Sequence, residues 1–313
     1  EEYVKKDASP EMNSRMRQMI TNLIAALHDD LQTLEWMSEA TRKQATAKLE
    51  AFLPKVGFPT KWRDYSALKI DRTSILGNME RASIFESKRD LADIGTPVDR
   101  TRWSMTPPTV NASYSPLYNA IQFPAGILHP PFFDLTADDA VNYGGIGAVI
   151  GHEMSHGFDD QGRQYDAQGL LRDWWTPEDA AKYNERATCV SDQFSSFEVR
   201  PGLMQVGKTV LGESIGDLGG LKLAYLAYKK SLNGKEAPVI DGYTGDQRFF
   251  LGWAQVWAAN QTPQADERQA RTDPHPLARF RVNGPLSNMP EFAAAFGCQT
   301  GDKMVRQNKC SIW

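Results

Sequence analysis

The chain has 313 residues, 41% of them hydrophobic and 24% charged, which is the composition of a globular protein long enough to bury a substantial core. Its formal net charge of −4 offers no general affinity for nucleic acid or for an anionic membrane surface. No apolar run approaches the ~18 residues of a membrane span, so we expect none in this chain. The N-terminus has neither an initiator Met nor the apolar core of a signal peptide, and we interpret it as an artificial or processed end.

The sequence is predicted to be mainly helical. Ser9 followed by Pro10 is typical of a helix start, and apolar residues then recur at helical spacing. A second helix is expected at 38–52, broken by the Pro and Gly residues of 54–59, and a third at 73–94. We expect the apolar stripes of these helices to be packing faces rather than binding sites. Helical patterns resume in the second half of the chain, from Thr176-Pro177, at 211–225, at 249–257 and at 289–296.

A hairpin is predicted between these helical regions. Strand-like runs at 110–114 and 119–123 flank the turn residues 115–118. The hairpin is either an ordinary surface feature or an edge strand whose free backbone groups bind an extended peptide. The stiff apolar loop at 124–133 contains His129, which could ligate a metal but is not the favoured candidate.

Residues His152 to His156 form an H-E-x-x-H motif. On a helix, positions i and i+4 share a face, so both imidazoles can reach one metal ion, and Glu153 can act on a water bound to that ion. With only five histidines in the chain, a random occurrence of this motif is roughly a one-per-cent event. The apolar residues just before it predict a buried helix with the metal at the bottom of a cleft.

A third metal ligand can come from the helix expected at 211–225. Glu213 and Asp217 are one turn apart, so Glu213 can complete a His2Glu zinc set while Asp217 accepts a ring N–H of a ligand histidine. Taken alone, Glu213 is better explained by the preference for acids in a first helical turn. The glycines between 216 and 220 indicate close approach to another element, since Gly inside a helix costs about 1 kcal/mol relative to Ala. The helix that carries the H-E-x-x-H motif is the obvious candidate.

These residues resemble the catalytic part of the neprilysin-type (M13) zinc endopeptidases. Asn111–Tyr114 is similar to the family's N-A-F-Y, and Glu213–Gly220 is similar to its E-N-x-A-D-x-G-G. The resemblance spans essentially the whole chain, because further stretches fit in order at 123–128, 142–163, 273–281 and 310–313. The chain departs from the family pattern mainly at positions that affect fine specificity, which are Ser113, Ala148, Ser214, Gly216 and Leu218.

The resemblance implies an α+β, mainly helical fold. Residues 96–313 would form a thermolysin-like zincin (gluzincin) catalytic domain with a small β-sheet. Residues 1–95 would be helices from the end of the family's lid domain and from the segments that link it to the catalytic domain.

The resemblance also implies roles for individual residues. His152, His156 and Glu213 would hold one zinc ion per chain. Three residues would serve catalysis, namely Glu153 as general base, Asp217 as a carboxylate behind the ligands and His275 as an oxyanion donor. Asn111, Ala112 and Arg281 would bind the substrate backbone. The pocket for the residue after the scissile bond would be formed by Ile127, Phe132, Ala148, Val149, Val256 and Trp257.

The function implied is a zinc-dependent endopeptidase that acts on small or medium peptides with a hydrophobic residue after the scissile bond. Two alternatives stay open. The chain could be a catalytically silent fragment that needs an N-terminal lid, or it could be a peptide-binding module. The intact Glu153 argues against the module, because a protein that only binds peptides has no need of a general base.

The three cysteines indicate which residues form a disulfide, which segment pairs with the third cysteine, and in which compartment the protein lies. Cys189 and Cys310 match positions that pair in the family, and Cys298 matches one that pairs with an N-terminal segment outside this chain. A disulfide favours an extracytoplasmic location. The expected partners are peptide substrates and an N-terminal lid segment of the same protein.

Overall fold

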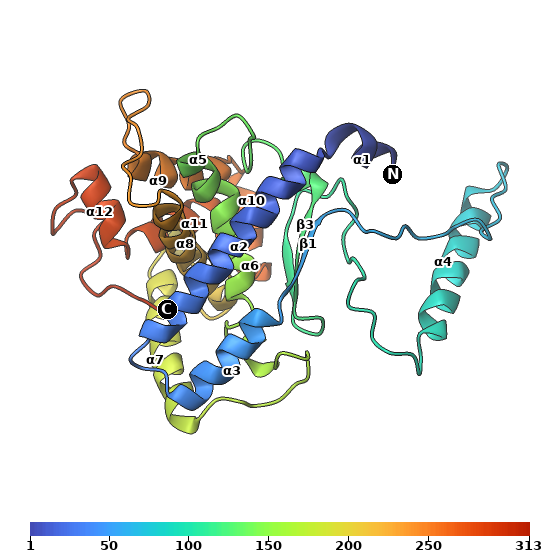
Figure 1. Cartoon of the computed structure of the whole chain (residues 1–313), viewed down its shortest axis with the longest axis horizontal. Coiled ribbons are helices and arrows are strands. Elements are labelled where there is room, and N and C mark those ends of the chain that lie inside the picture. Colours follow the sequence, from blue (N-terminus) through green and yellow to red (C-terminus); the bar gives the residue numbers. More distant parts are fainter.

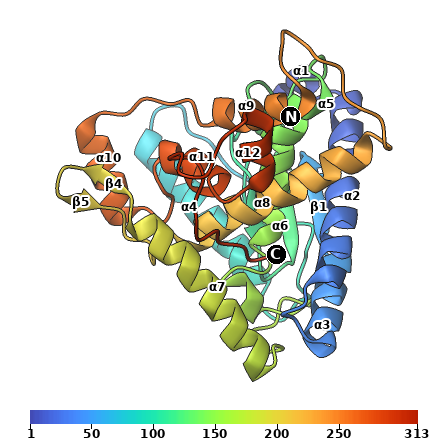
Figure 2. The ribbon, with the colours of Figure 1, turned by 90° about the vertical axis from the view of Figure 1, so that its left-hand side faces the viewer.

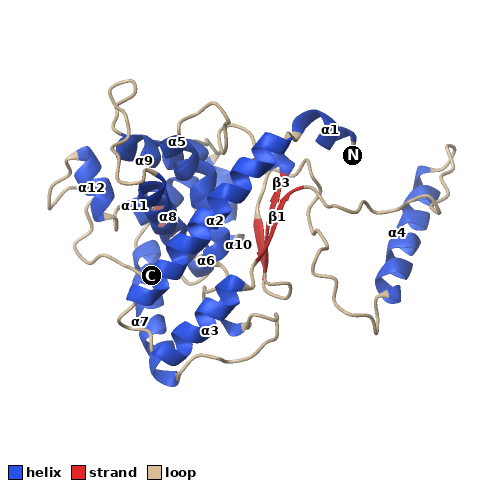
Figure 3. Ribbon diagram, viewed as in Figure 1, coloured by secondary structure: helices blue, strands red, loops and turns tan.

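The computed structural model describes residues 1–313 and is mainly helical, as expected, with a three-stranded and a two-stranded sheet (Figures 1 and 3). The side chains of Ser9, Ser38 and Thr176 cap the helices that follow them, as their sequence context predicts. The α-helices are α1 (Glu2–Asp7), α2 (Pro10–Thr33), α3 (Glu39–Glu50), α4 (Ile75–Ala92), α5 (Asp139–Asn142), α6 (Ala148–Ser155), α7 (Pro177–Ser195), α8 (Leu211–Ser231), α9 (Gly245–Val256), α10 (Pro263–Thr272), α11 (Ala278–Leu286) and α12 (Pro290–Phe296). No helix combines the length and the apolar character that crossing a membrane requires.

The main sheet has three strands in the order β1-β3-β2. β2 (Ser113–Ser115) and β3 (Ala120–Pro124) are antiparallel and form the predicted hairpin, so β2 is an edge strand. β1 (Leu53–Gly57) runs parallel to β3, with Leu53 opposite Ala120. The sequence prediction treated 54–59 only as helix breakers. Pro54 is nevertheless accommodated in β1, because an edge strand has one side whose N–H groups need no partner in the sheet. A separate hairpin joins β4 (Glu198–Arg200) and β5 (Leu203–Met204).

α6 and α8 cross at the centre of the molecule at very short distance (Figure 2). A Cβ atom added to Gly151 of α6 would lie 2.5 Å from the carbonyl oxygen of Gly220 in α8. A Cβ atom added to Gly220 would lie 2.4 Å from the backbone nitrogen of His152. The predicted close approach of the glycine-rich helix to the motif helix is therefore confirmed. A five-residue π-helix, η2 (Tyr143–Gly147), leads into α6.

The N-terminal helices share the core of the rest of the chain. The apolar stripe of α2 is buried and α2 packs against α8, which confirms the packing face predicted for this helix. α3 is held to α7 through Asp179, whose carboxylate accepts hydrogen bonds from the backbone of Ser38 at 3.0 Å and from the hydroxyl of Thr41 at 2.5 Å. Residues 10–57 pack with the C-terminal part of the chain in this structure. The division into two domains near residue 95 stays a prediction.

α4 lies apart from the body of the molecule, on two long connecting segments (Figure 1). The helix forms where the sequence predicts it, but none of its residues is buried. Ile75 and Leu76 are 81% and 75% exposed. The packing face predicted for this helix is therefore wrong within this chain, because the connecting segments hold it away from the body of the molecule.

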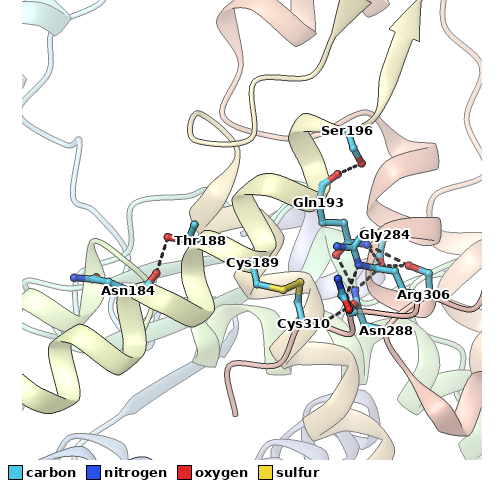
Figure 4. The surroundings of a disulfide bond; sticks show 11 residues. Asn184, Thr188, Cys189, Gln193, Ser196, Gly284, Asn288, Arg306 and Cys310 are labelled. Atoms are coloured by element: carbon cyan, nitrogen blue, oxygen red, sulfur yellow. Dashed lines mark hydrogen bonds between the residues drawn. A yellow bond between two sulfur atoms is a disulfide. The ribbon is translucent and has the colours of Figure 1, made fainter.

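The disulfide between Cys189 and Cys310 joins α7 to the C-terminal segment (Figure 4). The pairing implied by the resemblance is thus present, and it links residues 121 positions apart. The backbone N–H of Cys310 also donates to Asn288 at 2.8 Å. Together these contacts place the indole of Trp313 against Gly219 of α8. Cys298 is half-buried and has no disulfide partner in this chain.

Candidate metal centre and substrate cavity

Two histidines and a glutamate meet at the junction of α6 and α8. The Nε2 atoms of His152 and His156 are 2.9 Å apart, because i and i+4 share one helix face. The carboxylate of Glu213, in the first turn of α8, lies 3.3 Å from Nε2 of His152 and 3.6 Å from Nε2 of His156. One ligand atom of each residue can be chosen so that all lie within 4.8 Å of one another. His129 does not belong to this cluster.

The chemistry of these side chains fits a zinc ion. Nδ1 of His152 lies 2.8 Å from Asp217, and Nδ1 of His156 lies 2.7 Å from Asp159. When each Nδ1–H donates to its carboxylate, both Nε2 atoms direct lone pairs toward each other and toward Glu213. The two lone pairs and the Glu213 carboxylate would together bind a cation. Two imidazoles with one carboxylate are a standard zinc ligand set.

Arg281 anchors the carboxylate behind His152. Asp217 is fully buried and receives two hydrogen bonds of 2.7 Å from the Arg281 guanidinium. Burial alone would raise the pKa of Asp217, but the charge and hydrogen bonds of Arg281 hold it below its usual range. Burial alone would likewise lower the pKa of His152, but its hydrogen bonds to Asp217 and Glu213 raise it to about 10. Negative charge therefore dominates the surroundings of His152.

Glu153 is the other buried carboxyl group of the site. Only 6% of it is exposed, and burial raises its pKa, an effect that the neighbouring His152 and His156 oppose. A carboxyl group with a raised pKa can take up and release a proton near neutral pH more readily than an ordinary one. Glu153 lines the same cavity as the histidines.

The cavity has a volume of about 420 Å³ and runs between the hairpin and α6, α8 and α9. Asn111 and Ala112 line it just before β2, and Arg281 and His275 also line it. The His275 side chain is half exposed, with Nδ1 2.7 Å from Asp273 and Nε2 3.3 Å from Glu213. The apolar residues that line the cavity are Val110, Ala112, Ile127, Phe132, Val149, Trp253 and Trp257, together with the ring of Tyr114.

Comparison with known proteins identifies the family. The model for peptidase family M13 matches residues 111–312, and a second model with the same description matches residues 1–59. The chain belongs to peptidase family M13. The M13 chain is 41% identical to human endothelin-converting enzyme 1 and 38% identical to Drosophila melanogaster neprilysin-3, in each case over 99% of its own length. It covers only 42% and 41% of those two proteins, respectively.

Solved M13 structures share the fold. The Mycobacterium tuberculosis zinc metalloprotease Zmp1, crystallised with an inhibitor, superposes with a TM-score of 0.94 at 46% identity, over 99% of this chain and 48% of that one. PepO from Lactobacillus rhamnosis superposes with a TM-score of 0.85 at 32% identity, over 97% of this chain and 47% of that one. The chain described here therefore spans less than half of these relatives.

Two of the pocket residues expected from the M13 resemblance do not line the cavity. Ala148 is 1% exposed, and its carbonyl lies against Gly220 of α8. Val256 is half-buried beside Trp257, on a different face of the end of α9. Trp253 lines the cavity instead, one helical turn before Trp257, and the same i, i+4 rule that links the two histidines could have identified it.

The hydrogen bond from His156 to Asp159 was also not assigned from the sequence. Asp159 follows the motif by three residues. A carboxylate three residues after a histidine that is a candidate metal ligand is the signal that could have identified this contact.

Proposed function

We propose that this chain is the catalytic part of a zinc-dependent endopeptidase that cleaves small or medium peptides before a hydrophobic residue. The observation that carries the proposal is the convergence of the Nε2 atoms of His152 and His156 with Glu213, beside the buried carboxyl group of Glu153. Ionisable groups that are buried together at the wall of a cavity, with shifted pKa values, are typical of functional sites.

The proposed chemistry uses the side chains that line the cavity. His152, His156 and Glu213 would hold one zinc ion, which when bound supplies Lewis acidity to a water molecule and to the peptide carbonyl. Glu153 would take the proton from the water and pass it to the leaving amine. His275 would donate a hydrogen bond to the developing oxyanion. Asp217 would keep His152 oriented through Nδ1.

The substrate would bind along the edge strand β2. Its backbone would be held by Asn111, Ala112 and Arg281, and pairing with the free edge of β2 would align it across the metal. The residue after the scissile bond would enter the apolar end of the cavity, which favours Phe, Leu or a similar side chain. Ile127, Phe132, Val149 and Trp257 would contact it directly, with Ala148 and Val256 behind them.

Two further observations support proposals for the location and for the remaining partner. The disulfide favours an extracytoplasmic compartment. Because relatives are more than twice as long, we propose that an N-terminal segment of the same protein forms a helical lid over the cavity. A second candidate, a fragment that binds zinc but needs this lid for activity, is favoured by the uncovered apolar residues of α4.

Hydrolysis of a quenched fluorescent peptide by the zinc-loaded chain tests the proposal. We expect cleavage before Phe or Leu, loss of cleavage on chelation, recovery with zinc, and loss of at least a hundredfold in kcat in Glu153→Gln. Zinc binding without cleavage would favour the second candidate. A chain that binds no zinc would overturn both.

A further inference from the structure

Lys48 of α3 is a fully buried lysine whose ammonium group is completely satisfied by backbone. Its Nζ donates to the carbonyl oxygens of Gly157 at 2.6 Å, Gly162 at 2.7 Å and Tyr165 at 2.7 Å. An ammonium group has three N–H donors, so each donor has one acceptor. Lysine is almost never fully buried unless it is paired, and this pairing is with three carbonyl groups of one loop.

That loop, residues 157–165, begins directly after His156. Within it, one oxygen of Asp159 accepts hydrogen bonds from the backbone of Gln161 at 2.9 Å and of Gly162 at 2.6 Å. The other oxygen lies 2.7 Å from Nδ1 of His156. The loop folds back so tightly that a Cβ atom on Gly162 would lie 1.7 Å from the carbonyl oxygen of His156.

We propose that Lys48 is a positioning residue of the metal centre, which fixes the 157–165 loop and thereby holds Asp159 against His156. Lys48 does not itself line the cavity, so it would act on the metal centre through Asp159. This role rests on the proposed metal site, because it concerns the orientation of one of the expected ligands.

Aromatic rings lie beside the Lys48 side chain. Its Nζ lies 5.5 Å from the ring centre of Phe158 and 5.8 Å from that of Tyr114. Burial lowers the pKa of Lys48 to about 7, and the carboxylates of Asp159 and Asp166 oppose this shift. Without the ammonium group, three buried carbonyl oxygens would lose their donor, and the loop would be free to rearrange.

A double-mutant cycle with Lys48→Met and Asp159→Asn tests whether the lysine acts through the aspartate. Zinc affinity is measured by competition with a chromophoric chelator, and the His156 Nδ1–H signal is followed by NMR in the metal-free chain. We expect Lys48→Met to weaken zinc binding by about tenfold or more and to broaden this signal. The double variant should bind zinc within about twofold of Asp159→Asn alone, since the second change removes the same contact.

Thr41→Val is the matched control, because Thr41 is also a buried polar residue of α3 but contacts Asp179 of α7. It should lower Tm without altering zinc affinity or the His156 signal. If Lys48→Met did not fold, Lys48→Gln, which keeps an N–H donor group, would take its place under the same criteria.

The proposal is overturned if the Lys48 variant keeps wild-type zinc affinity and an unchanged His156 signal. It is also overturned if the two losses in the cycle simply add, or if the Thr41 control weakens zinc equally. A wild-type chain that binds no zinc would instead overturn the proposed function. In that case the His156 signal of the metal-free variants still decides the role of Lys48.

Discussion

Asp159 accepts a hydrogen bond from Nδ1 of His156 at 2.7 Å, from the first loop after the helix that carries this histidine. Asp217 makes the equivalent 2.8 Å contact with His152 from α8. Both imidazoles are therefore held in one tautomer and one orientation by separate elements of the fold. The candidate metal centre is therefore built from α8 and the 157–165 loop as well as from the H-E-x-x-H motif.

Replacing Asp159 by Asn should weaken zinc binding by about 10–100-fold, because the carboxylate that orients His156 and raises its basicity is lost. Isothermal titration or chelator competition measures this directly. Asp160→Asn is the matched control, since it makes the same charge change one residue later, at a carboxylate that accepts a hydrogen bond from the Gln161 side chain and not from His156. Equal losses in the two variants would attribute the effect to overall charge and contradict the specific role.

Filling the apolar end of the cavity should change substrate preference. Val149 lines the cavity and is 8% exposed, so Val149→Phe places a ring where a substrate side chain would sit. We expect kcat/KM to fall by about tenfold or more for peptides with Phe after the scissile bond, and by less for peptides with Ala there. Parallel assays of the two peptides give the ratio. An unchanged ratio would mean that the substrate side chain binds elsewhere.

Asp179 should contribute a pH-dependent part of the stability. Burial alone would raise its pKa, but hydrogen bonds from Ser38 and Thr41 hold it below its usual range. Because the folded pKa is lower than the unfolded one, the contribution is present above about pH 4 and is lost as the pH falls through the folded value. Asp179→Asn should therefore lower the free energy of unfolding by about 1–3 kcal/mol at pH 7.

Urea unfolding of wild type and Asp179→Asn at pH 7 and at pH 3 checks this account. The difference between the two proteins should shrink at the lower pH. The exposed Asp241→Asn serves as control and should change little at either pH. A difference that stayed constant between the two pH values would contradict the assignment.

Removing the disulfide should destabilise the chain. The bond closes a loop between positions 121 apart, and such a loop is worth about 2–5 kcal/mol. Cys189→Ala combined with Cys310→Ala should lower the free energy of unfolding by that amount, as measured by urea denaturation. Cys298→Ala should not, because Cys298 has no disulfide partner in this chain.

The sequence predicts those parts of the site that depend on residues close to one another in the chain. Helical spacing predicts the shared face of His152 and His156, and it also places Glu213 and Asp217 on one side of α8. The contacts of Lys48 could not be predicted, because its acceptors lie 109 to 117 positions away and are backbone atoms. The isolation of α4 was missed for a related reason, since an apolar stripe does not show which surface covers it.

The central claim is that His152, His156 and Glu213 hold one zinc ion. Anomalous diffraction at the zinc absorption edge, from crystals of the zinc-loaded chain, tests it most directly. We predict one strong peak per chain, within about 2.0–2.2 Å of both Nε2 atoms and of a Glu213 carboxylate oxygen. A peak at other residues, or no peak at this cluster, would contradict the account.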